Sequence, residues 1–143
     1  MKKATVIISA FVLLALIMFA CAKQEEEAME VDPTAELAAS VEHGKELFYD
    51  ESLGTSGMTC NSCHMEGGTK GGKMGDMTIR AFDDLGSKYP KYFGMATRVM
   101  TLSQVNNWCI VNPLEGEALA WDDQKLADLT AYVASVKPAP IEE

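Results

Sequence analysis

One short motif constrains this chain more than any other feature, the run Cys60-Asn61-Ser62-Cys63-His64. Cysteines at this spacing occur in three kinds of site. A redox-active Cys-x-x-Cys pair belongs in a βαβ context, which this sequence does not show. A structural zinc site needs further ligands, usually a second cysteine pair. The directly following histidine favours the third kind, the attachment signature of c-type haem.

The spacing of the motif has a chemical reason. Two thiols three positions apart can bond to the two vinyl groups on one edge of a haem, and the next residue directs its imidazole at the iron. We therefore predict one covalent haem c, bound through Cys60 and Cys63, with His64 as the proximal iron ligand. The sequence has no internal repeat, so we expect no second haem unit.

The N-terminus has the pattern of an export signal. Two lysines precede an apolar run that ends at Ala20, and Cys21 follows. The segment is interpreted first as a lipoprotein signal, in which Cys21 is acylated and anchors the protein to the membrane. The alternatives are an ordinary signal cut after Ala22 and an uncleaved anchor. All three place the protein outside the cytoplasm, in the bacterial cell envelope.

The chain divides by composition into three parts. Residues 1–20 are the predicted signal, residues 21–34 an acidic flexible tether, and residues 35–143 the folded domain. A domain of this length builds only a modest core, and a buried cofactor would supply much of the missing apolar contact.

The folded domain is predicted to be all-α. Helices are expected at residues 35–49, at 78–85, from Thr101 to Pro113, and from Asp122 or Asp123 to Pro138. Thr101 and Gln104 have the form of a capping box, and apolar residues at helical spacing mark the last helix. The glycine-rich stretch 66–75 is interpreted as a loop, and 89–93 as an aromatic turn. No stretch is convincing as a strand.

The formal charge is −9, and loss of Lys2 and Lys3 with the signal lowers it to −11. Nucleic acid is excluded as a partner, because phosphate binding needs a basic patch. We expect redox partner proteins with a basic docking face instead.

The distal side of the iron has several candidate ligands. Cys109 is a spare thiol in an exported protein, which makes it either a small buried hydrophobic residue or an iron ligand. Methionine is the common sixth ligand in cytochromes of this kind, and Met95 and Met100 come late enough in the chain to reach the distal side. Without a family resemblance, the sequence does not decide which of Cys109, Met100 and Met95 is the distal ligand.

Two levels of family resemblance follow. Gly44-Lys45-Glu46-Leu47-Phe48 and the stretch from Leu129 to Val133 resemble the crossing first and last helices of class I c-type cytochromes. Roughly residues 43–136 resemble one haem domain of thiosulfate dehydrogenases and related sulfur-oxidising cytochromes. That resemblance rests on Cys63 to Thr69, Lys88 to Tyr92, Val105 to Cys109 and Asn112 to Leu119. It implies that Cys109 is the distal haem ligand.

Departures from the pattern of thiosulfate dehydrogenases decide which function we expect. In those enzymes a basic residue and a hydroxyl follow the matching cysteine, where this sequence has Asn112 and Pro113, and a second haem domain passes electrons on. We therefore expect a one-electron carrier. The alternatives are a sulfur-anion oxidoreductase that uses a Cys-ligated haem, a haem subunit of a respiratory complex, and a haem-based ligand sensor.

Overall fold

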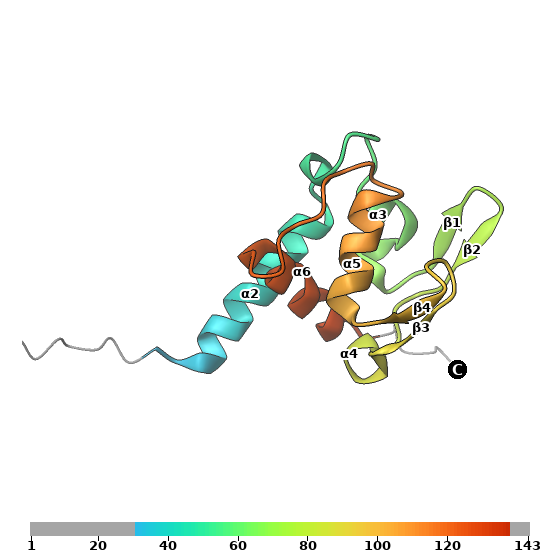
Figure 1. Cartoon of the computed structure of the whole chain (residues 1–143). Coiled ribbons are helices and arrows are strands. Elements are labelled where there is room, and N and C mark those ends of the chain that lie inside the picture. Colours follow the sequence, from blue (N-terminus) through green and yellow to red (C-terminus); the bar gives the residue numbers. More distant parts are fainter. Residues whose placement is uncertain (1–30, 138–143) are drawn as a thin grey trace, which may run out of the picture. The chain divides into compact units, whose positions relative to one another are not determined.

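The computed structural model describes residues 31–137 (Figure 1). The predicted signal, Cys21 and most of the predicted tether lie outside these residues. The helices and short helical turns are α2 Pro33–Phe48, η1 Glu51–Leu53, α3 Cys60–Cys63, η2 Glu66–Gly68, α4 Leu85–Lys88, α5 Leu102–Val111 and α6 Gln124–Ser135. The strands are β1 Gly72–Met74, β2 Met77–Ile79, β3 Lys91–Phe93 and β4 Arg98–Met100.

Helix α2 starts two residues before the predicted domain boundary, for a local reason. The carboxylate of Asp32 accepts a hydrogen bond from the Thr34 N–H at 2.9 Å, which satisfies one of the free donors of the first turn. Pro33 occupies the first helical position, where its missing N–H is no loss. Helix α2 ends at Phe48, which is buried in the core.

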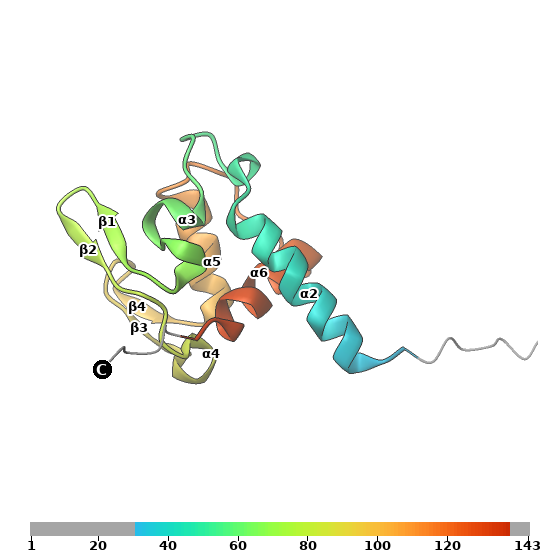
Figure 2. The ribbon, with the colours of Figure 1, turned by 180° about the vertical axis from the view of Figure 1, so that it is seen from behind.

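Helices α2 and α6 cross at close range, as the class I pattern predicts (Figures 1 and 2). A Cβ placed on Gly44 would lie 1.9 Å from the backbone oxygen of Asp128 and 2.8 Å from the Cβ of Tyr132. Only glycine fits this position, because any side chain would collide with the backbone of α6. The crossing therefore depends on the absence of a side chain at one residue.

The caps of the last two helices are as predicted. Thr101 and Gln104 form the capping box of α5, with the Thr101 N–H donating to the Gln104 side chain at 2.9 Å. Of the two candidate caps for α6, Asp123 is the one that accepts, from the Lys125 N–H at 2.9 Å. The predicted apolar stripe of α6 is buried along its length: Leu126, Leu129, Val133 and Val136.

The prediction that the domain has no strands is wrong in detail. Two antiparallel hairpins, β1–β2 and β3–β4, occupy one side of the molecule. The helix predicted at 78–85 is absent, because β2 takes residues 78 and 79, residues 80–84 are not helical, and α4 begins only at Leu85. Gly75, with a φ of 57°, makes the tight turn of β1–β2. Strands of three residues are too short to show the alternation by which strands are recognised. Helices still form the scaffold of the domain.

A single hydrophobic core joins the helices. Phe48 lies at its centre, with its ring in edge-to-face contact with those of Phe82 and Tyr132. Within residues 31–137 no helix is long and apolar enough to cross a membrane.

Candidate functional site

The two cysteines and the histidine of the motif are presented by a single turn of helix. Helix α3 begins after Thr59, whose N–H donates to the Ser62 hydroxyl at 3.0 Å. It ends at His64, whose N–H donates to the Cys60 carbonyl at 3.0 Å. Cys60 and Cys63 therefore lie one turn apart on the same short helix, with His64 directly after it.

All three side chains line one cavity of about 340 Å³, which is in the size range of cofactor pockets, roughly 300–1,000 Å³. Its wall is mainly apolar. The motif, helices α5 and α6, Phe48, both hairpins and the segment between them all contribute lining residues, as do Thr59, Pro113 and Leu114. The apolar lining residues include Phe48, Phe82, Leu102, Val105, Leu114, Leu129 and Val133.

His64 is held in the apolar wall. Its ring lies 4.5 Å from the ring of Phe82, and its Nδ1 atom is buried without a hydrogen-bond partner. Burial lowers the pKa of the imidazole, and the nearby Arg80 carbonyl acts in the opposite direction. The Arg80 carbonyl thus lies close to the imidazole without completing a well-formed hydrogen bond. A neutral imidazole is the form that binds a metal.

The loop that follows the motif, at Gly67 and Gly68, is hydrogen-bonded to the motif and to its neighbours. The Gly67 N–H donates to the Asn61 side chain at 2.9 Å, and the Tyr132 hydroxyl donates to the Gly67 carbonyl at 3.0 Å. The next carbonyl, of Gly68, accepts from the Phe82 N–H at 2.8 Å. The motif is therefore linked to helix α6 and to the aromatic ring beside His64.

Cys109 lies in the part of the wall that α5 contributes. Burial, and to a smaller extent the nearby Cys60 and Cys63, raise the pKa of its thiol to about 12. Burial also raises the pKa of Cys60, to about 11. The spare thiol is therefore within electrostatic range of the attachment cysteines and shares their cavity.

The two methionine candidates occupy different places. Met95 lines the cavity, although its residue is 43% exposed. Met100 is 1% exposed and is not among the residues that line the cavity. Of the three distal candidates, the structure brings Cys109 and Met95 together with the motif and leaves Met100 in the core.

Three cations at the cavity were missed by reasoning from the sequence: Arg80, Lys88 and Lys91. They come from the segment between the hairpins and from β3. Lys88 pairs with Asp83, and the Lys91 ammonium lies 4.7 Å from the centre of the Tyr89 ring. The sequence feature that could have indicated them is the high density of lysine and arginine in residues 70–100 of a chain that is otherwise acidic.

The residues present fit a covalent haem. Two thiols lie on one short helix and an imidazole directly after it, apolar side chains line the same cavity, and the buried Nδ1 of His64 has no hydrogen-bond partner. The cations at the cavity suit the two propionate carboxylates that a haem carries. A class I cytochrome fold around such a site defines a c-type cytochrome.

Comparison with known proteins agrees with this class. The model of the SoxA/TsdA cytochrome c domain matches residues 43–137, and the chain belongs to this family, whose cytochrome c domains hold covalent haem c. Among curated proteins none matches. Among solved structures, the fold is similar to thiosulfate dehydrogenase (TsdBA) from Marichromatium purpuratum in its "as isolated" form, with a TM-score of 0.52 and 21% identity. The match covers 80% of this chain and 26% of that one.

Proposed function

We propose that this protein is a one-electron carrier of the bacterial cell envelope. The observation that carries the proposal is the pairing of the haem motif with Cys109 in one mainly apolar cavity. The haem supplies a reversible ferric–ferrous couple. An iron with protein ligands on both sides can exchange electrons without binding a substrate, which is the chemistry of a carrier.

Each residue has a separate role in this proposal. Cys60 and Cys63 would attach the haem, His64 would provide the proximal nitrogen, and Cys109 would provide the distal sulfur. Phe82 packs against His64 and limits its rotation. The apolar wall excludes water, which favours the less charged oxidation state and helps to set the potential.

The distal ligand can be tested by spectroscopy on the ferric holoprotein. We expect a thiolate-type low-spin electron paramagnetic resonance signal that is lost in Cys109→Ala and kept in the matched variant Met95→Leu. The reverse pattern, with a methionine charge-transfer band lost in Met95→Leu, would assign the distal position to Met95.

The side chain of Asn112 argues against an enzyme active site next to Cys109. Its amide donates to the Trp108 carbonyl at 2.8 Å, and its backbone N–H donates to the same oxygen at 3.0 Å. Asn112 therefore closes the end of α5, and Pro113 has no N–H to offer. Neither position supplies a charge to hold an anion.

A second function, oxidation of sulfur anions, is favoured by one observation. Arg80, Lys88 and Lys91 line the same cavity as Cys109 and would attract an anion. The test is turnover of thiosulfate with an electron acceptor, measured together with haem spectra. For a carrier we expect neither turnover nor a spectral change, and steady turnover would establish the enzyme.

Membrane attachment is part of the proposal and rests on the sequence around Cys21. Acylation at this residue would hold the haem domain near membrane partners. Labelling with a radioactive fatty acid in a lipoprotein-processing host should mark the wild type and leave Cys21→Ser unlabelled. Labelling of the variant would remove Cys21 as the site.

A further inference from the structure

The charges of the described residues are distributed unevenly. Residues 70–100, which contain both hairpins, hold six of the nine lysines and arginines of residues 31–137 and only three carboxylates, a net charge of +3. The other described residues hold three cations and twelve carboxylates, a net charge of −9. Two haem propionates would lower the hairpin side to about +1 by charge counting, and the contrast between the sides would remain.

Ion pairing leaves the net charge of the hairpin side unchanged, because the pairing of Lys70 with Glu66 offsets that of Asp84 with Lys137. Two of the three carboxylates on the hairpin side are paired, Asp83 with Lys88 and Asp84 with Lys137. Lys73 and Arg98 are exposed, and neither has a carboxylate within ion-pair distance among the described residues. The positive charge of these two side chains is therefore directed at solvent.

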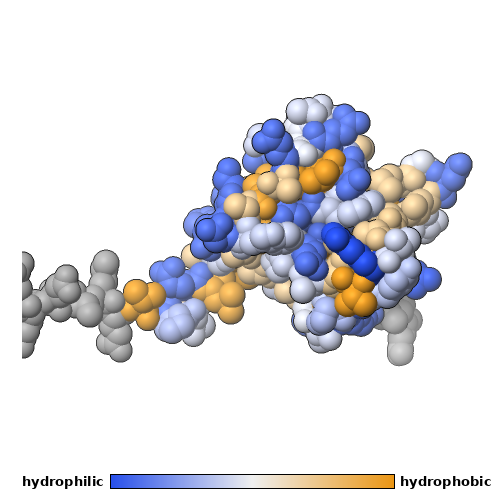
Figure 3. Space-filling view, viewed as in Figure 1, coloured by the Kyte–Doolittle hydropathy of each residue, from blue (hydrophilic) through white to orange (hydrophobic). Residues whose placement is uncertain are grey.

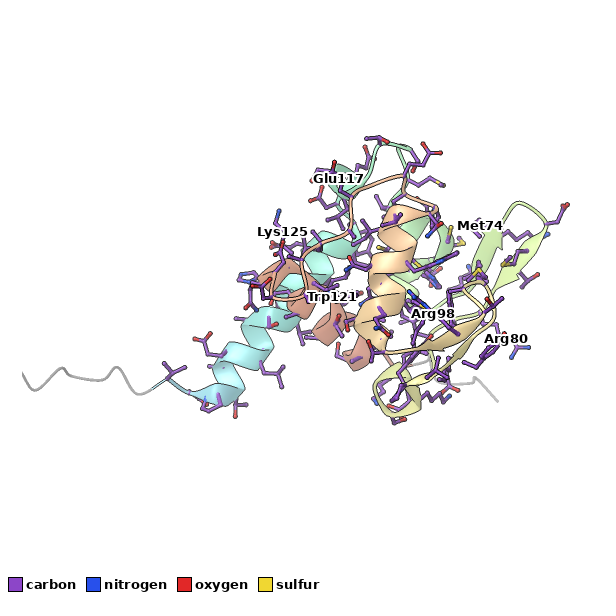
Figure 4. All side chains as sticks on the ribbon, in the orientation of Figure 1. Met74, Arg80, Arg98, Glu117, Trp121 and Lys125 are labelled. Atoms are coloured by element: carbon purple, nitrogen blue, oxygen red, sulfur yellow. The ribbon has the colours of Figure 1, made fainter. Side chains whose placement is uncertain are left out.

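The same hairpins expose apolar side chains. Tyr92 and Val99 face each other across β3–β4 and are 63% and 66% exposed. Directly opposite residues of a hairpin project from the same face, so these two form one apolar pair on its outer surface. Arg98 is opposite Phe93 and therefore projects from the other face, next to Val99 along the strand. Figure 3 shows hydrophobic atoms over β3 and β4 beside one of the most hydrophilic groups on that side. Arg80, Arg98 and Met74 lie on this side, whereas Lys125 and Trp121 lie away from it (Figure 4).

This surface lies next to the haem cavity. Phe93 of β3 and Met74 of β1 line the cavity. Tyr92 and Val99 project from the opposite face of the β3–β4 hairpin to Phe93. A partner seated on the outer face of β3–β4 would have this hairpin, whose Phe93 lines the cavity, between it and the cavity. An apolar centre with a charged rim is the usual composition of a protein interface.

We propose that the two hairpins are the electron-transfer docking surface and that the partner protein presents carboxylates around an apolar centre. The net charge alone favours the opposite, a basic partner. At an ionic strength of 0.1 M, charges beyond about 10 Å are largely screened, so the local charge at the docking surface governs the encounter. The inference rests on the proposed carrier function.

The first test uses two small oxidants of opposite charge with the ferrous holoprotein. The haem iron loses one electron, and ferricyanide becomes ferrocyanide or tris(phenanthroline)cobalt(III) becomes cobalt(II). We expect the rate constant with ferricyanide to fall by about threefold or more between roughly 10 mM and 200 mM salt. A rise with salt would show that net charge dominates and would overturn the docking surface. Absence of electron transfer with both oxidants would instead overturn the carrier function.

Charge-reversal variants locate the effect. Lys73→Glu and Arg98→Glu should each slow ferricyanide reduction at low salt by about threefold, and neither residue lines the haem cavity. Lys45→Glu and Lys125→Glu change the net charge equally at exposed positions outside the hairpins, and should change the rate by less than about 1.5-fold. Equal effects from all four variants would overturn the proposal.

A pair of protein reagents tests the apolar centre. An acidic blue-copper protein should accept electrons faster than a basic c-type cytochrome of similar potential. Tyr92→Ser should slow transfer to the blue-copper protein by about threefold or more, without changing the ferricyanide rate. An unchanged rate with the blue-copper protein, or a preference for the basic cytochrome, would refute the surface.

Discussion

The Tyr132 hydroxyl and the Gly67 carbonyl, 65 residues apart in the sequence, are joined by a buried hydrogen bond of 3.0 Å. The bond connects helix α6 with the loop that follows the haem motif. Gly67 adopts a φ of 66°, and a Cβ at this position would lie 2.6 Å from the same hydroxyl. The Tyr132–Gly67 hydrogen bond therefore connects helix α6 directly to the loop beside His64.

Tyr132→Phe should lower the free energy of unfolding of the holoprotein by about 1–3 kcal/mol, because it leaves the Gly67 carbonyl without its partner. Denaturant unfolding followed by the Soret band measures the change. Tyr92→Phe, at an exposed residue, is the matched control and should be neutral. Equal stability of both variants would mean that the buried bond contributes nothing.

Gly44→Ala should destabilise the protein by about 3 kcal/mol or more, since the new methyl group would overlap the Asp128 backbone. Gly94→Ala is the control, because a Cβ there meets no atom within 4 Å. Thermal unfolding of the two holoproteins gives the comparison. A Gly44→Ala protein as stable as Gly94→Ala would contradict the close crossing of α2 and α6.

The side chain of Asn107 makes two hydrogen bonds to the segment that connects α5 and α6. Its amide donates to the Leu119 carbonyl at 2.9 Å, and its carbonyl accepts from the Leu119 N–H at 2.9 Å. Asn107→Ala should lower the free energy of unfolding by about 2–4 kcal/mol, since the two partly buried backbone groups of Leu119 lose their partners. Asn112→Ala removes one exposed bond and should cost less than about 1 kcal/mol. Urea unfolding of both variants tests the ranking, and a reversed order would refute it.

Cys109→Met should raise the reduction potential by on the order of 100 mV or more, because a thioether donates less electron density to ferric iron than a thiolate. Potentiometric titration of the holoprotein measures the shift. Met95→Leu should leave the potential within about 30 mV of wild type. A shift confined to Met95→Leu would make Met95 the residue that sets the potential.

The sequence predicted the helical scaffold well because its signals are local or periodic. The Thr101 capping box, the cap at Asp123 and the stripe of α6 all describe contacts within a few residues, and the structure has each of them. The small residue expected at the helix crossing, Gly44, is also where the structure needs it.

The hairpins and the cations of the cavity could not be predicted in the same way. Residues such as Lys91 and Arg98 carry no pattern on their own, and their meaning depends on where three-residue strands place them. The net charge predicts a basic partner, and the distribution of charge on the structure leads to the acidic partner proposed above, because a net charge holds no information on position. For the distal ligand, the sequence left three residues open, and the fold separates Met100 from the cavity.

The division between the helix crossing and the hairpins has an evolutionary consequence. The contact between Gly44 and α6 fixes the fold, whereas Lys73, Tyr92, Arg98 and Val99 lie on short surface strands and take no part in that crossing. Substitutions at these four exposed positions, which do not line the cavity, can accumulate with little effect on folding or haem attachment. Descendants of one ancestral domain could thus acquire new electron acceptors through a few surface changes while the inherited haem pocket stays intact.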